Sequence, residues 1–473
     1  MFNIQKTKGD EAMRKSIKGI LGIASFGVVI ALVIVFYPTT GSLQGTWTPL
    51  ELVTPESSDH SIDPEITMDH LGNIHVAWED DDSTMNASGV DRDIYYKWFD
   101  KQAGAWKPAE LVSTGSTHHS QEPDVEVDKD GNVHVAWYEE TSFNIFYRRR
   151  VKQLGEWTPI QVISTEGLGG ALSPVIKVDN QGNIHATWWD DSNIMGSGTD
   201  RDVFYKFWNE TMGIWTECEL VSSESGNDSF AQQLGVDQEG NVYVSWRDDS
   251  MYGGSGVDED IFFKIKDAST GTWTTTWVVS SMSTLFSSYL KMEVAGNGDV
   301  HFIWAESGEL IYRCWRAASS SWSVREIVTG ECTGNSRYPD LAIDGAGNVH
   351  LTWHDSSDYK GADGDYDVFY KHWNNGNKSW CNASVVSLES DSDSWEPQIA
   401  INDRIISIIF YEFTDTGGSG PDSDVFMKKL ALKEASAIPG YGTPIMCIIL
   451  GCGLTILAIS TWRQNRQEHA RER

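Results

Sequence analysis

Apolar and polar residues alternate with a period of two along most of the chain, and one phrase recurs at intervals. A proline and a short apolar segment come first, Asp-x-x-Gly-Asn follows, and a second apolar segment containing His ends on Trp, as in residues 123–137. Period-two alternation is typical of β-strands, and Gly-Asn supplies the positive φ that a tight turn between strands needs. The phrase predicts a β-hairpin, with Val133, Val135 and Trp137 on one face of its second strand.

The hairpin occurs seven times. Its closing aromatic residue falls at Trp78, Trp137, Trp188, Trp246, Trp304, Trp353 and Phe410, at spacings of 59, 51, 58, 58, 49 and 57 residues. A second series, which opens another strand, falls at Trp47, Trp106, Trp157, Trp215, Trp273, Trp322 and Trp380. Four strands in each repeat and no helical periodicity between residues 45 and 430 are typical of propeller blades. Residues 46–430 are therefore predicted to form an all-β, seven-bladed β-propeller.

The ends of the repeat region predict how the ring closes. Residues 46–53 read as a fourth strand that precedes the first repeat, whereas the last repeat ends at its third strand, residues 424–428. We expect residues 47–53 to pair with residues 424–428 and complete the last blade. Such pairing removes an exposed sheet edge.

Both ends of the chain read as membrane segments. Residues 19–37 and 444–462 form the two apolar runs, and each is just long enough to cross a bilayer as a helix. The alternative for the first run is a signal peptide or an uncleaved signal anchor. Basic residues flank the outer end of each run, so the tails, residues 1–18 and 463–473, are predicted to be cytoplasmic. The propeller and its linker, residues 431–443, are then extracytoplasmic.

The chain is acidic, with 36 basic and 68 acidic residues. Without the two tails, 27 basic and 64 acidic residues remain, so nucleic acid is excluded as a partner and a cationic ligand or metal is favoured. Four cysteines lie between the membrane segments at inequivalent positions of the repeats, which is not a disulfide or zinc pattern. Five glycosylation sequons, at Asn86, Asn209, Asn227, Asn377 and Asn382, fit an exported glycoprotein.

Acidic loops are the first candidate for chemistry. Five repeats carry a Gly-rich loop after the Trp-bearing strand, and repeats two and five, which have the short spacings, lack it. Each loop begins with carboxylates and ends with Asp-x-Asp, so its two acidic ends converge. Clustered oxygen ligands with a Gly hinge favour Ca²⁺, with solvated structural carboxylates as the alternative. The candidate metal ligands are Asp80, Asp91, Asp93, Asp190, Asp200, Asp202, Asp248, Asp258, Asp260, Asp355, Asp363, Asp365 and Asp367.

Topology places a second candidate on the same face. The acidic loops and the connections between blades join strands at the same end, and propeller ligands often lie over the central channel. The candidate ligand-binding residues there are His60, His118, His119, Arg337, Tyr338 and Trp395. By contrast, His75, His134, His185, His301 and His350 occupy one repeated position and lie whole blades apart. They are too far apart to share one metal ion, so we expect them to pack structurally between blades.

The repeat resembles the sialidase-like (BNR) propeller superfamily. Its phrase Gly-Asn-apolar-His-Val-x-Trp is most similar to the non-catalytic, exported and lectin-like branch, and the resemblance covers residues 46–430. Sialidases carry Asp boxes, an Arg-Ile-Pro element and three arginines that hold the substrate carboxylate. This chain has neither the boxes nor Arg-Ile-Pro, and no motif groups its arginines. Glycoside hydrolysis also needs two opposed carboxylates, and no pair stands out among so many acids.

These observations leave three functions open. The first is a membrane-anchored cell-surface propeller that recognises a glycan or a protein without catalysis. The second is a sialidase-like glycosidase or lyase, and the third is a structural component of the cell envelope. Recognition is favoured because no single repeat has an outstanding catalytic signature.

Overall fold

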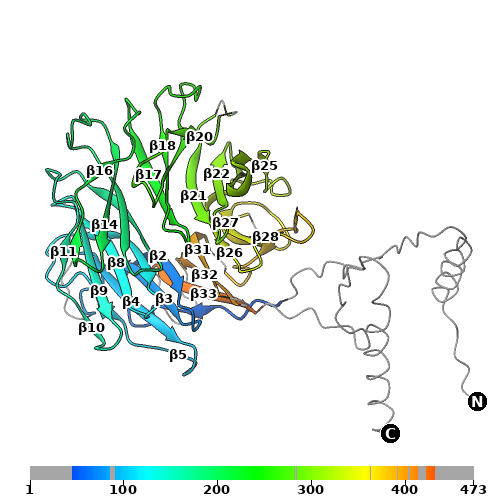
Figure 1. Ribbon diagram of the computed structural model, residues 1–473. Coiled ribbons are helices and arrows are strands. Elements are labelled where there is room, and N and C mark those ends of the chain that lie inside the picture. Colours follow the sequence, from blue (N-terminus) through cyan, green and yellow to red (C-terminus); the bar gives the residue numbers. More distant parts are fainter. Residues whose placement is uncertain are drawn as a thin grey trace, which may run out of the picture. The chain divides into compact units, whose positions relative to one another are not determined.

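The computed structural model describes residues 45–85, 91–281, 283, 285–362, 364–390, 392–402, 405–413 and 422–431. Within these residues the chain forms seven antiparallel sheets, which Figure 1 shows arranged around a common centre. The one helical turn of this part is a 3-10 turn, Ala317–Ser319. The prediction of an all-β, seven-bladed propeller is confirmed.

The first four blades follow the chain in order. Blade 1 contains β2 (Ser61–Met68), β3 (Ile74–Asp80), β4 (Asp93–Asp100), β5 (Ala105–Trp106) and β6 (Glu110–Leu111). Blade 2 contains β7 (Ser120–Val127), β8 (Val133–Glu139), β9 (Asn144–Val151), β10 (Glu156–Trp157) and β11 (Gln161–Val162). Blade 3 contains β12 (Leu172–Val178), β13 (Ile184–Asp190), β14 (Asp202–Asn209), β15 (Ile214–Trp215) and β16 (Glu219–Leu220). Blade 4 contains β17 (Ser229–Val236), β18 (Val242–Asp248), β19 (Asp260–Lys266) and β20 (Trp277–Val278).

The last three blades complete the ring. Blade 5 contains β21 (Ser288–Val294), β22 (Val300–Glu306), β23 (Glu309–Arg316), β24 (Ser321–Trp322) and β25 (Glu326–Ile327). Blade 6 contains β26 (Arg337–Ile343), β27 (Val349–Asp355), β28 (Asp367–Asn374), β29 (Ser379–Trp380) and β30 (Ser384–Val385). Blade 7 contains β31 (Ser394–Asn402), β32 (Ile405–Glu412), β33 (Asp424–Ala431) and, from the start of the chain, β1 (Glu51–Leu52).

Blade 7 is closed by the N-terminal strand, as predicted. Strand β1 pairs antiparallel with β33, with Glu51 opposite Met427 and Leu52 opposite Phe426. An isolated bridge between Trp47 and Leu430 extends the pairing, and the amide of Val53 donates to the carbonyl of Val425 at 2.8 Å. The ring therefore ends without an unpaired strand at its junction.

The outermost strand of most blades is broken into two short pieces, which the sequence did not predict. In blade 2, Trp157 pairs with Arg150 in β9, but Gln161 pairs with Tyr147, so the register shifts by one residue between β10 and β11. Pro159 lies in the break, where its missing N–H costs no ladder hydrogen bond. Blades 1, 3, 5 and 6 show the same division in their outer strand.

The hydrophobic core is divided among the interfaces between blades. Seven clusters of buried side chains are present, and each joins one blade to the next. The repeated Trp side chains fill them, since Trp78, Trp188 and Trp353 are fully buried. A large aromatic ring supplies the apolar area that one thin sheet lacks. The repeated Trp is therefore a core position.

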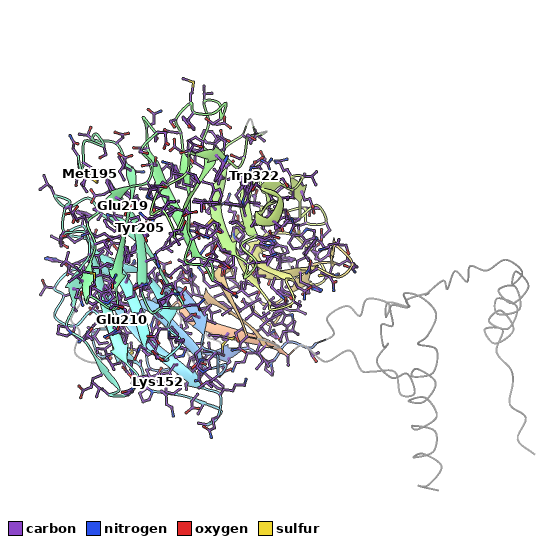
Figure 2. The ribbon with its side chains drawn as sticks, in the orientation of Figure 1. Lys152, Met195, Tyr205, Glu210, Glu219 and Trp322 are labelled. Carbon is purple, nitrogen blue, oxygen red and sulfur yellow. The ribbon has the colours of Figure 1, made fainter. Side chains whose placement is uncertain are left out.

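The repeated histidines are structural, as expected. Each lies buried beside a tyrosine of the neighbouring strand in its own blade, for example His134 Nδ1 to the Tyr147 hydroxyl at 2.8 Å. The Tyr147 ring then packs edge-on against Trp215 of the next blade. Tyr205, labelled in Figure 2, makes the same contact with Trp273 in the next blade around the ring. Burial lowers the pKa of His134, so the ring is neutral and connects the two strands by hydrogen bonds.

No helix within the described residues is long and apolar enough to cross a membrane. The two predicted membrane segments, both tails and the linker from residue 432 onward lie outside the described residues.

Candidate functional site at the channel mouth

Each inner strand carries a bulge at the same height. The residue at the bulge has a φ between 46° and 54°, although none is glycine: Asp63, Glu122, Ser173, Ala231, Tyr289, Tyr338 and Glu396. Residues other than glycine rarely adopt this backbone conformation, which costs about 1–3 kcal/mol and persists only where the surroundings impose it. In this ring the bulge turns one side chain from every blade toward the central channel. We call these seven residues the mouth ring.

The mouth ring opens onto a cavity of about 780 Å³ between the inner strands. The side chains that line this cavity include eight acids and three bases. The acids are Asp63, Glu65, Glu122, Asp124, Glu126, Glu293, Asp340 and Glu396, and the bases are Lys177, Arg247 and Lys291. The excess of acid makes the channel attractive to cations and unfavourable for anions.

Four carboxyl groups of blades 7, 1 and 2 form an acidic sector at the mouth. Glu79, at the end of β3, is fully buried; its Oε1 accepts the amide of Glu122 at 2.7 Å and its Oε2 lies 3.3 Å from Arg92 Nη1. Asp63 hydrogen-bonds to the carboxyl groups of both Glu79 and Glu396. The acidic sector therefore consists of Asp63, Glu79, Glu122 and Glu396.

The acidic sector holds protons at neutral pH. Burial and the neighbouring Asp63 raise the pKa of Glu396 to about 9. The same two causes raise the pKa of Glu79 well above its usual value, against the pull of Arg92. Burial also raises the pKa of Glu122, whose carboxylate accepts the Ser173 hydroxyl. Carboxyl groups in contact cannot all ionise, so they share protons.

An aromatic sector lies next to the acidic one, in blades 5, 6 and 7. The rings of Tyr289 and Tyr338 have centroids 4.3 Å apart, and Tyr338 lies 5.1 Å from His354. His354 in turn lies 5.0 Å from both Tyr366 and Trp395. We call these five side chains the aromatic sector. Tyr338 is 38% exposed and so presents part of its ring to a ligand.

His354 joins the two sectors. Its Nδ1 accepts the backbone amide of Glu396 at 3.3 Å, while its Nε2 is buried and has no hydrogen-bond partner within the described residues. Burial and the charge of Arg337 lower the pKa of His354 to about 3, so the ring is neutral. Since Nδ1 accepts, Nε2 carries the hydrogen and is a buried donor without an acceptor.

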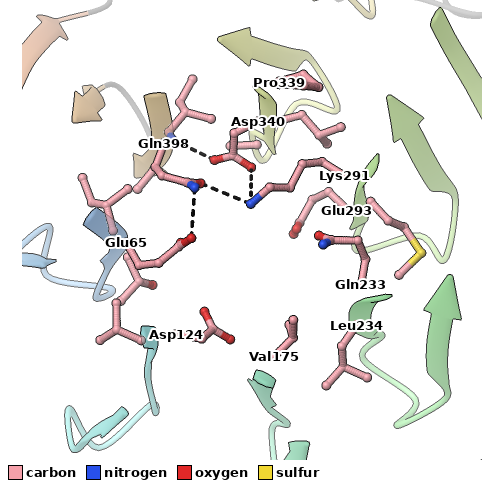
Figure 3. Close-up of a pocket in the computed structure, with 18 of the residues that line it drawn as sticks. Glu65, Asp124, Val175, Gln233, Leu234, Lys291, Glu293, Pro339, Asp340 and Gln398 are labelled. Atoms are coloured by element: carbon pink, nitrogen blue, oxygen red, sulfur yellow. Dashed lines mark hydrogen bonds and ion pairs between the residues drawn. The ribbon is translucent and has the colours of Figure 1, made fainter. Parts of the chain in front are cut away.

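Deeper in the channel, polar side chains connect neighbouring blades (Figure 3). Gln398 Nε2 donates to Glu65 Oε1 at 2.9 Å, and Lys291 Nζ lies 3.4 Å from Gln398 Oε1 and 3.9 Å from Asp340 Oδ1. Burial raises the pKa of Glu65 to about 8 even though Lys291 opposes the shift. Two lysines thus neutralise part of the deep channel, and the mouth keeps its own excess of acid.

The structure separates the six ligand-binding residues predicted from loop position into two groups, one at the channel and one farther out. Tyr338 lines the channel, and Trp395 and Arg337 lie beside it around His354. The three histidines lie farther out, on exposed connections. His60 contacts Ser423 and the ring of Phe413, His119 Nδ1 accepts the amide of Arg92 at 2.9 Å, and His118 is exposed. Ligand binding by any of the six stays a prediction.

The acidic loops bring their two ends together as predicted. The first and last acids of each loop are opposite each other in the ladder, as in Asp80 with Asp93, Asp190 with Asp202, Asp248 with Asp260, and Asp355 with Asp367. Blades 2 and 5 lack the loop, as their spacing indicated.

Serine hydroxyls occupy many of these carboxylates. Ser61 and Ser229 donate to Asp80 and Asp248, both at 2.7 Å, and Ser222 donates to Asp202 at 2.6 Å. No group of three or more His, Cys, Asp or Glu residues could hold a metal ion in the described part of the chain, and Asp363 lies outside it. Calcium binding by the loops therefore stays a prediction.

The acidic sector was missed by the sequence analysis, although a signal for it exists. At most positions the seven repeats agree, because those positions build the blade. The residue after the repeated Trp or Phe does not agree: it is Glu79, Tyr138, Trp189, Arg247, Ala305, His354 and Tyr411. The residue before the repeated Pro position also varies, with five residue types among the seven blades, and it forms the mouth ring. Divergence within a repeat marks positions that the fold does not dictate.

Comparison with known proteins supports the fold alone. No family model and no curated protein matches the sequence. Solved structures that match include the polysaccharide lyase Uly1, at 11% identity and a TM-score of 0.54, covering 82% of this chain and 99% of that one. A fungal alcohol oxidase of the AA5 family in complex with copper matches at 11% identity and a TM-score of 0.52, over 83% of this chain and 78% of that one.

The NanB sialidase from Streptococcus pneumoniae matches at 10% identity and a TM-score of 0.43, over 79% of this chain and 68% of that one. The seven-bladed fold that the resemblance implies is confirmed by the sheet topology. The chain is a seven-bladed β-propeller.

Proposed function

We propose that this protein is a membrane-anchored cell-surface propeller that recognises a glycan at the channel mouth without cleaving it. The observation that carries the proposal is the pairing of an aromatic sector with an acidic sector at the place where the repeats diverge. A repeat protein keeps its structural positions constant, so chemistry confined to divergent positions is best explained by a ligand.

The mouth offers what a sugar ring requires. Tyr338 and Trp395 present aromatic faces against which the C–H face of a sugar packs, and the carboxyl groups next to them accept or donate hydrogen bonds to hydroxyls. The cavity below, about 780 Å³, lies within the size range of small-molecule sites. The excess of acid disfavours uronic or sialic acids, so we expect neutral or positively charged sugars.

Contact between the carboxyl groups favours recognition over hydrolysis. Hydrolases place one carboxyl on each side of the glycosidic bond, about 5–9.5 Å apart. Asp63 and Glu396 are instead hydrogen-bonded to each other, so this pair acts as one proton-sharing unit. The observation that keeps an enzyme as the second candidate is the raised pKa of these acids, which is frequent at catalytic sites. The fold similarity to a polysaccharide lyase is compatible with that candidate.

A glycan array, followed by titration of the hits, tests the proposed function. We expect Trp395→Ala to weaken binding by roughly tenfold or more, because the sugar loses an aromatic face. The control is Phe230→Ala, since Phe230 occupies the equivalent position in blade 4, where Arg201 and Arg247 cover its ring. Equal losses in both variants would contradict a site in blades 5 to 7.

Turnover of any glycan that binds distinguishes a recognition protein from an enzyme. A new reducing end or an unsaturated product that disappears in Glu396→Gln would make the protein an enzyme. Absence of both binding and turnover would favour a structural component of the cell envelope.

Membrane attachment is supported by the two apolar segments, residues 19–37 and 444–462. Protease added to intact cells should remove the propeller and spare a tag at residue 1, because the basic residues that flank each segment predict cytoplasmic tails. A cleaved tag with a protected propeller would reverse the topology.

A further inference from the structure

Two aspartates at the start of β19 carry carboxylate oxygens without a partner. Asp258 and Asp260 are two positions apart, so their Cα atoms are no more than about 7 Å from each other. The Oδ2 atoms of both side chains are buried and have no hydrogen-bond partner among the residues that the structure describes. Asp260 is fully buried, and its Oδ1 accepts the Ser280 hydroxyl. Burial and the charge of Asp258 raise the pKa of Asp260 to about 6, as expected for two carboxyl groups that lie close together.

A serine hydroxyl beside these aspartates also lacks a partner. The amide of Ser287 donates to the carbonyl of Glu259 at 3.0 Å, which brings the start of blade 5 against the residue between the two aspartates. Ser287 is fully buried, and its hydroxyl makes no hydrogen bond within the described part of the chain. A buried hydroxyl or carboxylate without a partner costs free energy, so such atoms gathered in one place point to a ligand from outside the chain.

The hydroxyl is left without a partner because blade 5 differs from blades 1 and 4. In those blades the serine at this position donates to the aspartate that ends the second strand, as Ser229 does to Asp248. Blade 5 has Glu306 at the end of that strand, and the two Glu306 oxygens accept from Trp304 and Arg325. The three unpartnered oxygens therefore belong to the interface between blades 4 and 5, rather than to the two ends of one loop.

The neighbouring base does not compensate these oxygens. Arg247 pairs with Glu259, and its Nε donates to the backbone carbonyl of Ser287 at 3.0 Å. Neither acceptor is one of the three unpartnered atoms, which stay without a donor although a guanidinium lies nearby.

Oxygen atoms that lack donors are suited to a hard cation. Ca²⁺ takes about six to eight oxygen ligands in a flexible geometry, whereas Mg²⁺ demands a near-ideal octahedron. No three His, Cys, Asp or Glu side chains in the described ranges gather around one metal position, so a hydroxyl is needed as the third side-chain ligand. We propose that Ca²⁺ binds between blades 4 and 5 to Asp258, Asp260 and Ser287, with backbone carbonyls and water completing its coordination. None of the three residues lines the channel cavity, so this site is independent of glycan recognition.

Calorimetric titration of calcium chloride into the chelator-treated, full-length protein tests the site. We expect a dissociation constant of about 10⁻⁴ to 10⁻³ M, as in extracellular calcium modules, and binding of magnesium chloride at least about tenfold weaker. Calcium at ten times the dissociation constant should raise the melting temperature by about 1–3 °C over that in chelator.

Two variants make the measurement specific to these oxygens. Asp258→Asn removes one of the two charges, so calcium should bind about tenfold more weakly or not at all. Because Asp258 Oδ2 has no donor to lose and repels Asp260, this variant should melt in chelator at the temperature of the parent or above it. Ser287→Ala removes an uncharged ligand and should weaken calcium binding by roughly fivefold. Asp191→Asn, at an exposed position of the corresponding loop in blade 3, is the control and should bind calcium as the parent does.

Several outcomes would overturn the assignment. A parent protein that gives no heat and no change in melting temperature with calcium would leave the three oxygens to water. Calcium binding that survives in Asp258→Asn, or that weakens equally in Asp191→Asn, would remove the ion from this interface. An Asp258→Asn variant that melts below the parent in chelator and binds calcium normally would make Asp258 a structural residue. Equal affinity for magnesium would exclude a site selective for calcium.

Discussion

At the scale of single residues, comparison of the seven repeats separates the polar side chains that build the blade from those at divergent positions. Asp128, from the Asp-x-x-Gly-Asn turn, accepts the amides of Asp130 and Asn132 at 2.9 and 2.8 Å, and it also lies 3.4 Å from His134 Nε2. Gly131 completes the turn with a φ of 81°. Five of the seven hairpins keep an Asp at this turn position and an imidazole or a tyrosine hydroxyl above it, so this cluster belongs to the blade.

Removal of Asp128 should therefore destabilise the protein. Burial alone would raise the pKa of Asp128, but hydrogen bonds from His134 and Asn132 outweigh it and lower the pKa to about 2. We expect Asp128→Ala to lower the free energy of unfolding by about 2–3 kcal/mol, because several donors lose their acceptor. Urea denaturation measures the effect, and Asp130→Ala, at an exposed position of the same turn, is the control. A similar loss in both variants would mean that the turn, not the carboxylate, matters.

The structural residues were predictable and the mouth ring was not. The repeated Trp and His positions follow from period two and burial. A non-glycine residue with positive φ before Pro, as at Glu396, contradicts local preference, since the residue before Pro favours extended backbone. The conformation recurs at the bulge of all seven inner strands whatever residue stands there, so it belongs to the bulge and not to a residue preference that the sequence would reveal.

At the scale of elements, the strands of each hairpin followed directly from the sequence, as did the unusual origin of the closing strand. Trp47 packs edge-on against Tyr370 at 5.3 Å, and Val53 is fully buried. The break in the outer strand could not be predicted, because a one-residue shift leaves the apolar pattern nearly unchanged on so short a strand.

Deletion of the closing strand should open the ring. A variant lacking residues 1–53 leaves β33 as an unpaired edge and uncovers the cluster that Trp47, Leu50 and Leu52 join. We expect a melting temperature well below that of a matched variant lacking residues 1–44, together with association of the molecules through the exposed edge. Scanning calorimetry and size-exclusion chromatography measure both. Identical melting of the two variants would show that blade 7 is stable with three strands.

The calcium prediction belongs to the loops between the second and third strands. Binding at one hundred times the dissociation constant would add about 2.7 kcal/mol to the free energy of unfolding and so raise the melting temperature. The comparison is a thermal melt in millimolar Ca²⁺ against one in chelator, with Asp202→Asn as the loop variant. A melting temperature that does not respond to calcium would leave these acids as acceptors for serine hydroxyls such as Ser222.

At the scale of the whole molecule, the fold gathers acidic residues from distant parts of the chain into one channel. The sequence predicted which face carries the loops, but eight acids converge in the channel only because seven inner strands meet there. Glu65 and Asp340 are 275 positions apart in the chain and line one cavity. No pattern within a single repeat reports such a neighbourhood, so the channel chemistry required the structure.

This convergence gives the protein a defined pH dependence. Burial raises the pKa of Glu65 to about 8, of Glu293 to about 7, of Glu396 to about 9 and of Glu412 to about 7. In the unfolded chain a glutamate titrates at about 4.3. The folded state therefore binds more protons, and this contribution to stability is complete below about pH 4.3 and is lost as the pH rises toward 9.

The carboxyl groups with lowered pKa values determine how stability falls at low pH. Hydrogen bonds lower the pKa of Asp82 and Asp128 to about 2 despite burial, so their contribution is present above about pH 3.9 and is lost as the pH falls toward 2. We expect the melting temperature to be highest near pH 5, to fall steeply toward pH 2, and to fall gradually toward pH 9. The gradual fall in melting temperature is smaller than the full pKa shifts imply, because water in the channel screens half-buried carboxylates.

Melting curves from pH 2 to 9 at constant ionic strength measure this profile. The variant carrying both Glu65→Gln and Glu396→Gln should lose part of the alkaline fall, since neither amide has a charge to develop, and should melt like the parent near pH 5. Glu156→Gln serves as the control, because its exposed side chain should leave the whole profile unchanged. A parent protein whose stability is constant or rises between pH 5 and 9 would show that these carboxyl groups ionise without cost, and the proton-sharing arrangement at the mouth would then be wrong.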